Sequence, residues 1–330
     1  MRKKSIVVLC ALLLASAFAG AAFASTQFIT IVTGSTGGTY YPIGTILANH
    51  FNAELMDKGY KFSAQSSGGT VENLDMMLRG EAEMAIAMAN LTGFAYTGTV
   101  QYEGKEKNEN LRYIMGLWPD VTQFIVSGAS GIESWADLRG KKIAVGPAAS
   151  GTEFSSRVLL KSLAGLDFDD IKPEYVGYSE AAQALQNGQL DGFNAEAGFP
   201  VGAVAELYAG RQKINMMEFS SEDLEKLKVD APFYAGVVIP AGIYPGQDED
   251  LRVAGIKSAL IVNEDVPEDL VYEMLRIIYS KKDELLNEHA GFKMVDFDNP
   301  VDGLFAAPLH PGAVKFFTEI GMAIPEDRLP

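Results

Sequence analysis

Residue types that carry much of enzyme chemistry are scarce in this chain of 330 residues. It contains one cysteine, Cys10, and three histidines, His50, His289 and His310. Cys10 lies in an apolar run near the N-terminus, so the rest of the chain offers no disulfide, zinc–thiolate site or thiol nucleophile. None of the histidines belongs to an H-E-x-x-H motif, and no G-x-S-x-G turn occurs. We therefore expect a protein that is not an enzyme and that uses neither a metal nor a cofactor.

Basic residues are also in short supply. The 27 Lys and Arg residues are outnumbered by 43 Asp and Glu residues, which gives a net charge of −16. A nucleic acid needs a basic face to neutralise its phosphates, so we expect no nucleic-acid partner. Anionic membrane surfaces are disfavoured by the same sign of charge. A hydrophobic content of 48% is enough for a sizeable core, and the length suggests two domains.

Long apolar runs are confined to the N-terminus. Three basic residues at positions 2–4 precede an apolar run over 6–18 and an Ala-Phe-Ala sequence that ends at Ala24. This order is typical of a secretory signal peptide, and the run is shorter than the roughly 20 residues that an uncleaved anchor requires. We predict a signal peptide over 1–24, cleaved after Ala24, and a mature protein of 306 residues outside the cytoplasmic membrane. Cleavage removes three basic and no acidic residues, which changes the net charge from −16 to −19.

The mature sequence alternates short β-rich runs with segments of helical period, which favours an α/β fold with crossover helices. Strands are expected over 28–33, 61–65, 83–89, 142–145, 174–178 and 191–196. Two further β-like runs, 113–117 and 122–126, are separated by Trp118-Pro119-Asp120, where we expect the chain to cross between two lobes. A return crossing is predicted over 233–239, followed by helices. The prediction is a discontinuous lobe 1 over 25–120 and 233–330, and a lobe 2 over 121–232.

Three glycine-containing loops each follow a predicted strand and precede a predicted helix. Backbone N–H groups at a helix N-terminus favour a carboxylate or phosphate, and hydroxyl groups add hydrogen bonds. Taken singly, each loop also fits an ordinary turn with a helix cap, as Ser150 followed by Glu153 does. Three such loops at the carboxyl ends of strands favour a ligand site. The candidate residues in these loops are Ser35, Gly37, Gly38, Thr39 and Tyr40; Ser67 and Thr70; and Ser150, Gly151 and Thr152.

Three candidates outside the loops complete the predicted site. Asn90 and Glu196 each stand at the end of a predicted strand, where a side chain points into the expected crevice. Trp118 is either an aromatic wall for a small ligand or a packing residue. A carboxylate at 196 could accept a hydrogen bond from a ligand ammonium group.

Several motifs occur in order along the mature chain: Ser35-Thr-Gly-Gly-Thr-Tyr-Tyr-Pro-Ile-Gly44, Gly68-Gly-Thr-Val-Glu-Asn-Leu74, Ser150-Gly-Thr-Glu153, Ala197-Gly-Phe-Pro200 and Pro308-Leu-His-Pro-Gly312. Together they resemble the TAXI family of solute receptors, which are the extracytoplasmic receptors of TRAP (tripartite ATP-independent periplasmic) transporters. Two positions depart from the family pattern. Met88-Ala89-Asn90 stands where a run like Gln-Ser-Asp often follows the third strand, and Glu196 stands where Thr often precedes Ala-Gly.

The resemblance implies a two-lobed α/β fold of the periplasmic-binding-protein type II, with a ligand cleft between the lobes. It also implies a periplasmic, monomeric receptor that captures a small carboxylate-bearing solute and delivers it to TRAP permease subunits in the membrane. Family ligands are typically glutamate, glutamine or related dicarboxylates. The family has no single arginine that defines carboxylate binding, in agreement with the three loops, which lack Arg and Lys. An alternative is a sensory receptor that presents the bound ligand to a membrane kinase or chemoreceptor.

Overall fold

The computed structural model describes residues 26–330, so the predicted signal peptide lies outside the described residues. The strands are β1 Gln27–Val32, β2 Tyr60–Gln65, β3 Met84–Met88, β4 Leu111–Ser127, β5 Lys142–Ala144, β6 Lys172–Glu174, β7 Gly192–Ala197, β8 Ile214–Met216, β9 Ala235–Ile239 and β10 Leu251–Asn263. The helices are α2 Tyr40–Leu55, α3 Thr70–Leu78, α4 Ala89–Thr97, α5 Gly151–Leu159, α6 Tyr178–Gln186, α7 Gly202–Tyr208, α8 Ser221–Asp230, α9 Glu268–Ser280, α10 Lys282–Glu288 and α11 Pro311–Glu319.

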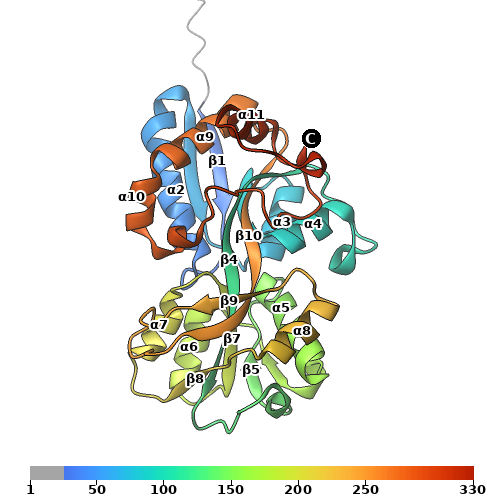
Figure 1. Cartoon of the computed structure of the whole chain (residues 1–330), viewed down its shortest axis with the longest axis vertical. Helices are drawn as coiled ribbons and strands as arrows, with labels where there is room; N and C mark the ends of the chain where they lie inside the picture. The colour runs from blue at the N-terminus through green and yellow to red at the C-terminus, as the bar shows by residue number, and fades with distance from the viewer. Residues whose placement is uncertain (1–25) are drawn as a thin grey trace, which may run out of the picture.

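The strands form one mixed sheet that continues through both halves of the molecule (Figure 1). Their order is β2-β1-β3-β10-β4-β7-β5-β6, with β8 paired to β4 and β9 paired to β10. Strands β1, β2 and β3 are parallel at one end, and β5, β6 and β7 are parallel at the other. The antiparallel pair β4 and β10 lies between the two parallel groups and runs through the waist of the molecule.

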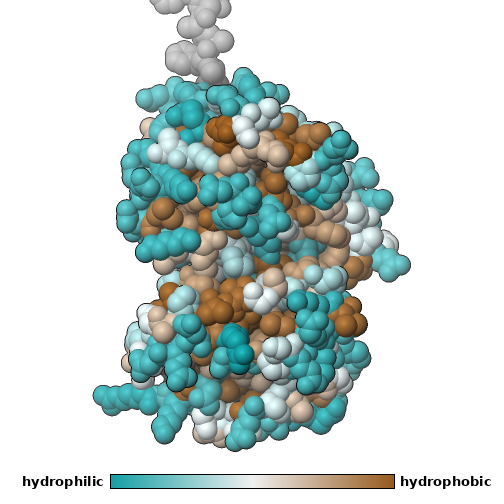
Figure 2. All heavy atoms as spheres, in the orientation of Figure 1, coloured by the Kyte–Doolittle hydropathy of each residue, from teal (hydrophilic) through white to brown (hydrophobic). Residues whose placement is uncertain are grey.

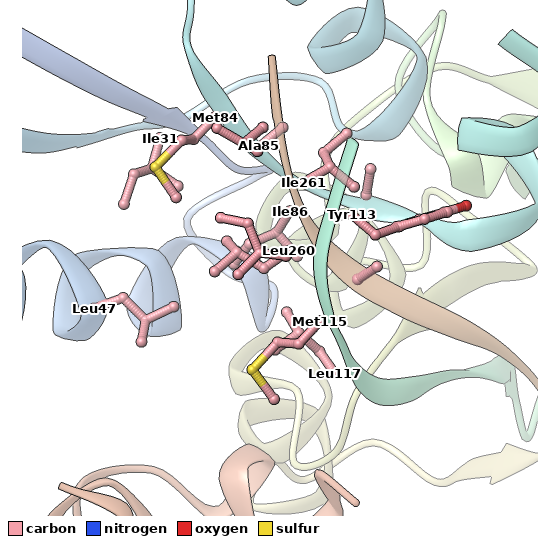
Figure 3. Close-up of a cluster of buried hydrophobic side chains, with 14 of the residues drawn as sticks. Ile31, Leu47, Met84, Ala85, Ile86, Tyr113, Met115, Leu117, Leu260 and Ile261 are labelled. Atoms are coloured by element: carbon pink, nitrogen blue, oxygen red, sulfur yellow. The ribbon is translucent and has the colours of Figure 1, made fainter. Parts of the chain in front are cut away.

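Two separate hydrophobic cores lie on either side of this waist. The first holds residues from the segments 29–118 and 259–317, and Figure 3 shows part of it, with Ile31, Ile86 and Leu260 among the labelled side chains. The second holds residues from 121–256. We propose that the two cores define two lobes, because each has its own fully buried apolar side chains.

The chain returns to the first lobe later than the sequence pattern suggested. The segment 233–239 contains β9, which pairs with Leu251–Gly255 of β10, and the buried apolar residues between Tyr234 and Ile256 pack in the second core. The return crossing is therefore β10, a strand that the sequence analysis did not predict. Its apolar run fits a buried strand and a buried helix equally well, since a strand covered on both faces does not alternate.

The break predicted between two strands at Trp118-Pro119-Asp120 lies inside a single strand. Strand β4 is continuous from Leu111 to Ser127, and its pairing with β10 shifts register between Lys257 and Ala259, beside Pro119. Proline has no N–H to donate to a ladder, so it fits at such an irregularity. The two predicted runs are thus the two ends of one crossing strand.

Hydrophilic residues cover much of the face shown in Figure 2, and hydrophobic residues gather across the waist. Within residues 26–330, no helix combines the length and the apolar content needed to cross a bilayer.

Asn73 ties the first glycine loops to the sheet. Its side chain is fully buried on α3. Nδ2 donates to the carbonyl oxygens of Thr33 at 2.6 Å and Ile86 at 2.9 Å, and Oδ1 accepts from the Ser67 hydroxyl at 2.6 Å. One amide therefore satisfies the ends of β1 and β3 and fixes the loop that precedes α3.

We expect Asn73→Ala to lower the free energy of unfolding by about 2–3 kcal/mol, because it leaves buried carbonyl groups without donors. Urea denaturation measures this loss. Asn287→Ala, at an exposed position on α10, is the matched control and should change the value by less than about 0.5 kcal/mol. A loss for Asn73→Ala no larger than that of the control contradicts the anchoring role.

Candidate functional site

A cavity lies between the two lobes, and we call it the central cavity; its space is about 430 Å³ when the part open to solvent is included. The first lobe contributes residues of the loops around Ser35 and Gly68, and Met88 at the end of β3. The second lobe contributes the loop from Pro147 to Thr152, with Tyr178, Glu196 and Ala197. Nine of the thirteen predicted site residues line it: Ser35, Gly38, Thr39, Tyr40, Thr70, Ser150, Gly151, Thr152 and Glu196.

Four helices begin at the wall of the central cavity. Tyr40, Thr70, Gly151 and Tyr178 are the first residues of α2, α3, α5 and α6, and all four line the cavity. The first N–H groups of a helix have no partner within it, and the helix dipole places partial positive charge there. Four N-termini from two lobes thus place partial positive charge at the wall of one cavity, which suits an anionic group.

Tyr178 is a cavity residue that the sequence analysis missed. We predicted a strand over 174–178, but β6 ends at Glu174 and Tyr178 opens α6. Its hydroxyl accepts a hydrogen bond from Thr152 at 2.6 Å and donates one to the backbone oxygen of Glu196 at 2.9 Å. A Cβ atom at Gly38 would lie 3.2 Å from the Tyr178 ring, so a glycine there lets the two lobes approach closely.

Hydroxyl groups of the three loops form hydrogen bonds within the protein. Ser150 is the N-cap of α5, and its Oγ accepts from the Glu153 N–H at 2.9 Å, as the capping interpretation predicted. The Thr39 hydroxyl donates to the Gly198 oxygen across the lobes at 2.8 Å. Thr70 Oγ1 accepts from the Met88 N–H at 3.1 Å, which leaves its proton available to a ligand.

Four predicted residues do not line the central cavity. Gly37 packs against Ser179, and Ser67 donates to Asn73. Trp118 is fully buried, so it is a packing residue and not a wall of the cavity. Asn90 lies on the first turn of α4 and lines a different pocket. Its strand-end position misled the prediction, because the chain turns directly from β3 into α4.

Glu196 places a buried carboxyl group in the cavity wall. The residue is 4% exposed; Oε2 accepts from the Thr122 hydroxyl at 2.9 Å, and Oε1 has no hydrogen-bond partner. Burial raises the pKa of Glu196 well above its ordinary value, against the opposing effect of Thr122. The Ser35 hydroxyl in the same cavity also lacks a partner. Buried polar atoms without partners are rare in native proteins, so both atoms are candidates for ligand contact.

Further unpartnered polar atoms lie close to Glu196. The Asn194 side chain lowers the pKa of Glu196, although burial raises it more. Burial also raises the pKa of Tyr234; the nearby Glu196 raises it further, and Ser155 lowers it. Asn194 Oδ1, Ser155 Oγ and Tyr234 Oη are buried without hydrogen-bond partners. The sequence analysis missed these residues. Strand periodicity could have found Asn194, because residues two apart on β7 share a face.

Asp120 joins the first lobe to the crossing strand. It is fully buried on β4, and its carboxyl group accepts hydrogen bonds from the Tyr40 hydroxyl and from Trp118 Nε1, the latter at 3.0 Å. Burial raises the pKa of Asp120 from its ordinary value of 3.8 to about 7, although these hydrogen bonds lower it. The Tyr40 ring and the Trp118 ring pack edge to face with centroids 6.1 Å apart. Trp118 therefore supports a wall residue from behind.

The charges around the central cavity are unusual for an anion site. Among its lining residues, all in the described part of the chain, there is no Lys or Arg, and Glu196 is the one carboxylate. Within residues 26–330, no group of three or more His, Cys, Asp or Glu side chains is placed to hold a metal ion. The site can offer helix N-termini and hydroxyls to an anion, and a carboxylate to a cation.

A model of the NMT1-like family matches residues 31–321, so the chain belongs to that family. Among solved structures, a protein of Bordetella bronchiseptica RB50 superposes with a TM-score of 0.52 at 19% sequence identity, covering 91% of this chain and 85% of that chain. This likeness supports the α/β fold. The predicted α/β fold class is confirmed, as a mixed central sheet with flanking helices.

Two other similar structures are transport proteins by description. The periplasmic aliphatic sulphonate binding protein SsuA of Escherichia coli has a TM-score of 0.43 at 17% identity, covering 89% of this chain and 84% of that chain. A putative L-cystine ABC transporter protein of Listeria monocytogenes has a TM-score of 0.47 at 16% identity, covering 84% of this chain and 100% of that chain.

The buried Asp120 predicts a stability that falls as pH rises. Between pH 3.8 and about 7 the folded protein keeps this carboxyl protonated while the unfolded chain ionises it. The folded state then binds more protons, so the free energy of unfolding decreases with pH by up to about 1.4 kcal/mol per unit. We expect Asp120→Asn, which stays neutral, to remove this part of the slope. Chemical denaturation from pH 4 to pH 8 measures it.

The exposed Asp298→Asn variant is the control for this measurement and should keep the wild-type slope. A wild-type slope that persists unchanged in Asp120→Asn shows that another group is responsible.

Proposed function

We propose that this member of the NMT1-like family is an extracytoplasmic solute receptor that binds a small zwitterionic amino acid in the central cavity. The observation that carries the proposal is a cavity between two lobes, with four helix N-termini and one unpartnered carboxyl oxygen in its wall. Concave, largely preformed cavities with a few convergent polar groups are typical of small-molecule sites.

The carboxylate of the ligand lies at the helix N-termini. Thr70, Gly151 and Thr152 come from two helices that begin at the cavity, one from each lobe. A Cβ atom at Gly151 would lie 3.2 Å from Thr70 Oγ1, so the two N-termini are close neighbours. Backbone N–H groups and the Thr70 hydroxyl then hold the carboxylate without an arginine.

The ammonium group of the ligand pairs with Glu196 Oε1. This pairing satisfies a buried acceptor and returns the Glu196 pKa toward its ordinary range, since an adjacent positive charge favours the ionised form. A dicarboxylate brings no cation to Glu196 and requires that carboxyl group to stay protonated. For this reason we favour a glutamate-like or glutamine-like amino acid over a dicarboxylate.

Capture involves movement of the lobes. Cavity walls come from both lobes, and Thr39 hydrogen-bonds across the cavity rim to Gly198. A ligand enters when the lobes separate about the crossing strands β4 and β10, and it then stabilises their contact. The protein binds its ligand without chemical change.

We further propose that the receptor belongs to the TAXI family, is exported by its N-terminal signal to the periplasm, and delivers its ligand as a monomer to a TRAP permease. The ordered motifs from Ser35 to Gly312 support this assignment. The second candidate is a sensory receptor for a membrane kinase or chemoreceptor, since the same bound form can be read by either partner. A neighbouring permease gene supports transport, and a neighbouring histidine kinase gene supports sensing.

A thermal-shift screen tests whether the central cavity binds amino acids. We expect L-glutamate or L-glutamine at about 100 times its Kd to stabilise the protein by about 2.7 kcal/mol, which raises Tm by several degrees. Thr70→Val removes the hydroxyl that donates to the ligand carboxylate in this proposal and should weaken binding about tenfold. Thr318→Val, at an exposed position on α11, is the matched control and should leave binding unchanged. The absence of any shift across a panel of amino and dicarboxylic acids contradicts the proposal.

The role of Glu196 is tested with two ligands that differ by an amino group. We expect Glu196→Gln to weaken the binding of L-glutamate at least tenfold and to change the affinity for glutarate less than about twofold, because only glutamate carries the ammonium group. Isothermal titration calorimetry measures both affinities. Equal losses for the two ligands refute the ammonium pairing while leaving the carboxylate site intact.

A further inference from the structure

A second pocket lies beside the central cavity, and we call it the lateral pocket. It has a volume of about 990 Å³, part of it open to solvent. Its walls include Phe94 of α4, Phe154 of α5, Phe233 before β9, and Phe305. In Figure 1, α4 lies above the waist and α5 and α8 lie below it on the same side of the molecule. The lateral pocket is thus formed by both lobes.

The four phenylalanines form one connected aromatic surface. The Phe94 ring centroid is 6.3 Å from that of Phe154, 5.9 Å from Phe233 and 5.6 Å from Phe305, in edge-to-face geometry. Rings in this arrangement present both faces and edges to an inserted planar group. Phe305 is 45% exposed, so part of this apolar surface faces water.

Asn90 is the one neutral polar side chain that lines the lateral pocket, within the part of the chain that the structure describes. It is 2% exposed, and both Nδ2 and Oδ1 lack hydrogen-bond partners. A buried carboxamide without partners is costly, and a native protein retains one where a ligand or water satisfies it. Phe305 covers this part of α4, since a Cβ atom at Gly93 would lie 2.1 Å from its ring.

The charges of the lateral pocket restrict what it can hold. Its lining residues include no Lys, Arg or His among those described, and the exposed Asp230 is the one ionisable group. An anion therefore meets repulsion at the rim and no cation inside. A carboxamide offers a donor and an acceptor side by side, and a second amide group matches both at once.

We infer that the lateral pocket is a second ligand site, which takes an uncharged aromatic molecule bearing a carboxamide or lactam group. The ring lies among the four phenylalanines, and the amide group pairs with Asn90. This site is separate from the amino-acid site proposed above, because no residue lines both cavities. Its occupant contacts both lobes, so binding here is linked to lobe contact.

Benzamide is the probe for this site, titrated into the mature chain by ligand-observed NMR and soaked into crystals. We expect one-to-one binding, with the ring among Phe94, Phe154 and Phe233 in the crystal. Asn90→Leu keeps the side-chain size but removes the amide, and it should weaken benzamide about tenfold. Benzoate should bind about tenfold more weakly than benzamide. Asn287→Leu, on the exposed face of α10, is the matched control and should not change binding.

Stability of the free protein provides a second measurement. Asn90→Leu removes an unpartnered buried amide, so we expect its Tm without benzamide to be equal to or above that of the wild type. Phe233→Leu removes one aromatic ring from the pocket wall and should weaken the binding of benzamide roughly fivefold. This variant tests the site even if Asn90→Leu fails to fold. Unchanged affinity in both variants, or benzamide found only in the central cavity, overturns the inference. Neither result bears on amino-acid binding at Glu196.

Discussion

The antiparallel pairing of β4 and β10 is the constraint on which the rest of the structure depends. Both strands pass from one hydrophobic core to the other, so each lobe is built on an end of the same two strands. Strand β4 carries Asp120 at the waist and Thr122 beside Glu196. A single continuous sheet therefore sets the distance between the two walls of the central cavity, and the loops only complete them.

Electrostatics explains how the central cavity can hold charge without a basic side chain. Four helices direct their N-termini at it, while Glu196 and Asp120 keep their carboxyl groups buried nearby. These partial positive charges are balanced only in part in the ligand-free protein, because burial favours the protonated form of both carboxyl groups. A ligand with both signs of charge completes this balance, whereas a ligand of one sign leaves one partner unsatisfied. Two atoms at the cavity have no hydrogen-bond partner within the protein: Oε1 of Glu196 and the hydroxyl oxygen of Ser35. A ligand with both signs of charge would supply partners for them.

Sequence patterns predicted the strands and loops of the first lobe well, because local signals there agree with the tertiary structure. Strand β1, the glycine loop after it and helix α2 lie where the hydrophobic periodicity, the turn residues and the position of a proline predicted them. The patterns failed at β10, an apolar run without strand alternation, and at Tyr178, which was placed in a strand but opens α6. In the site, nine of thirteen candidates line the cavity; Gly37 and Ser67 come from the same loops, but they face Ser179 and Asn73. Trp118 and Asn90 do not line it, because the backbone turns them toward other surroundings.

The sequence by itself determined the class of this protein: an acidic α/β chain with a predicted export signal, little nucleophilic chemistry and three loops suited to anions. These properties depend on composition and on short-range spacing, which a linear sequence records. The tertiary structure decided which of those loops meet, that Tyr178, Asn194 and Tyr234 stand beside Glu196, and that Asn90 faces a separate aromatic pocket. Such neighbours are brought together by the pairing of strands far apart in the chain, and burial then sets the pKa and the hydrogen bonds of each group.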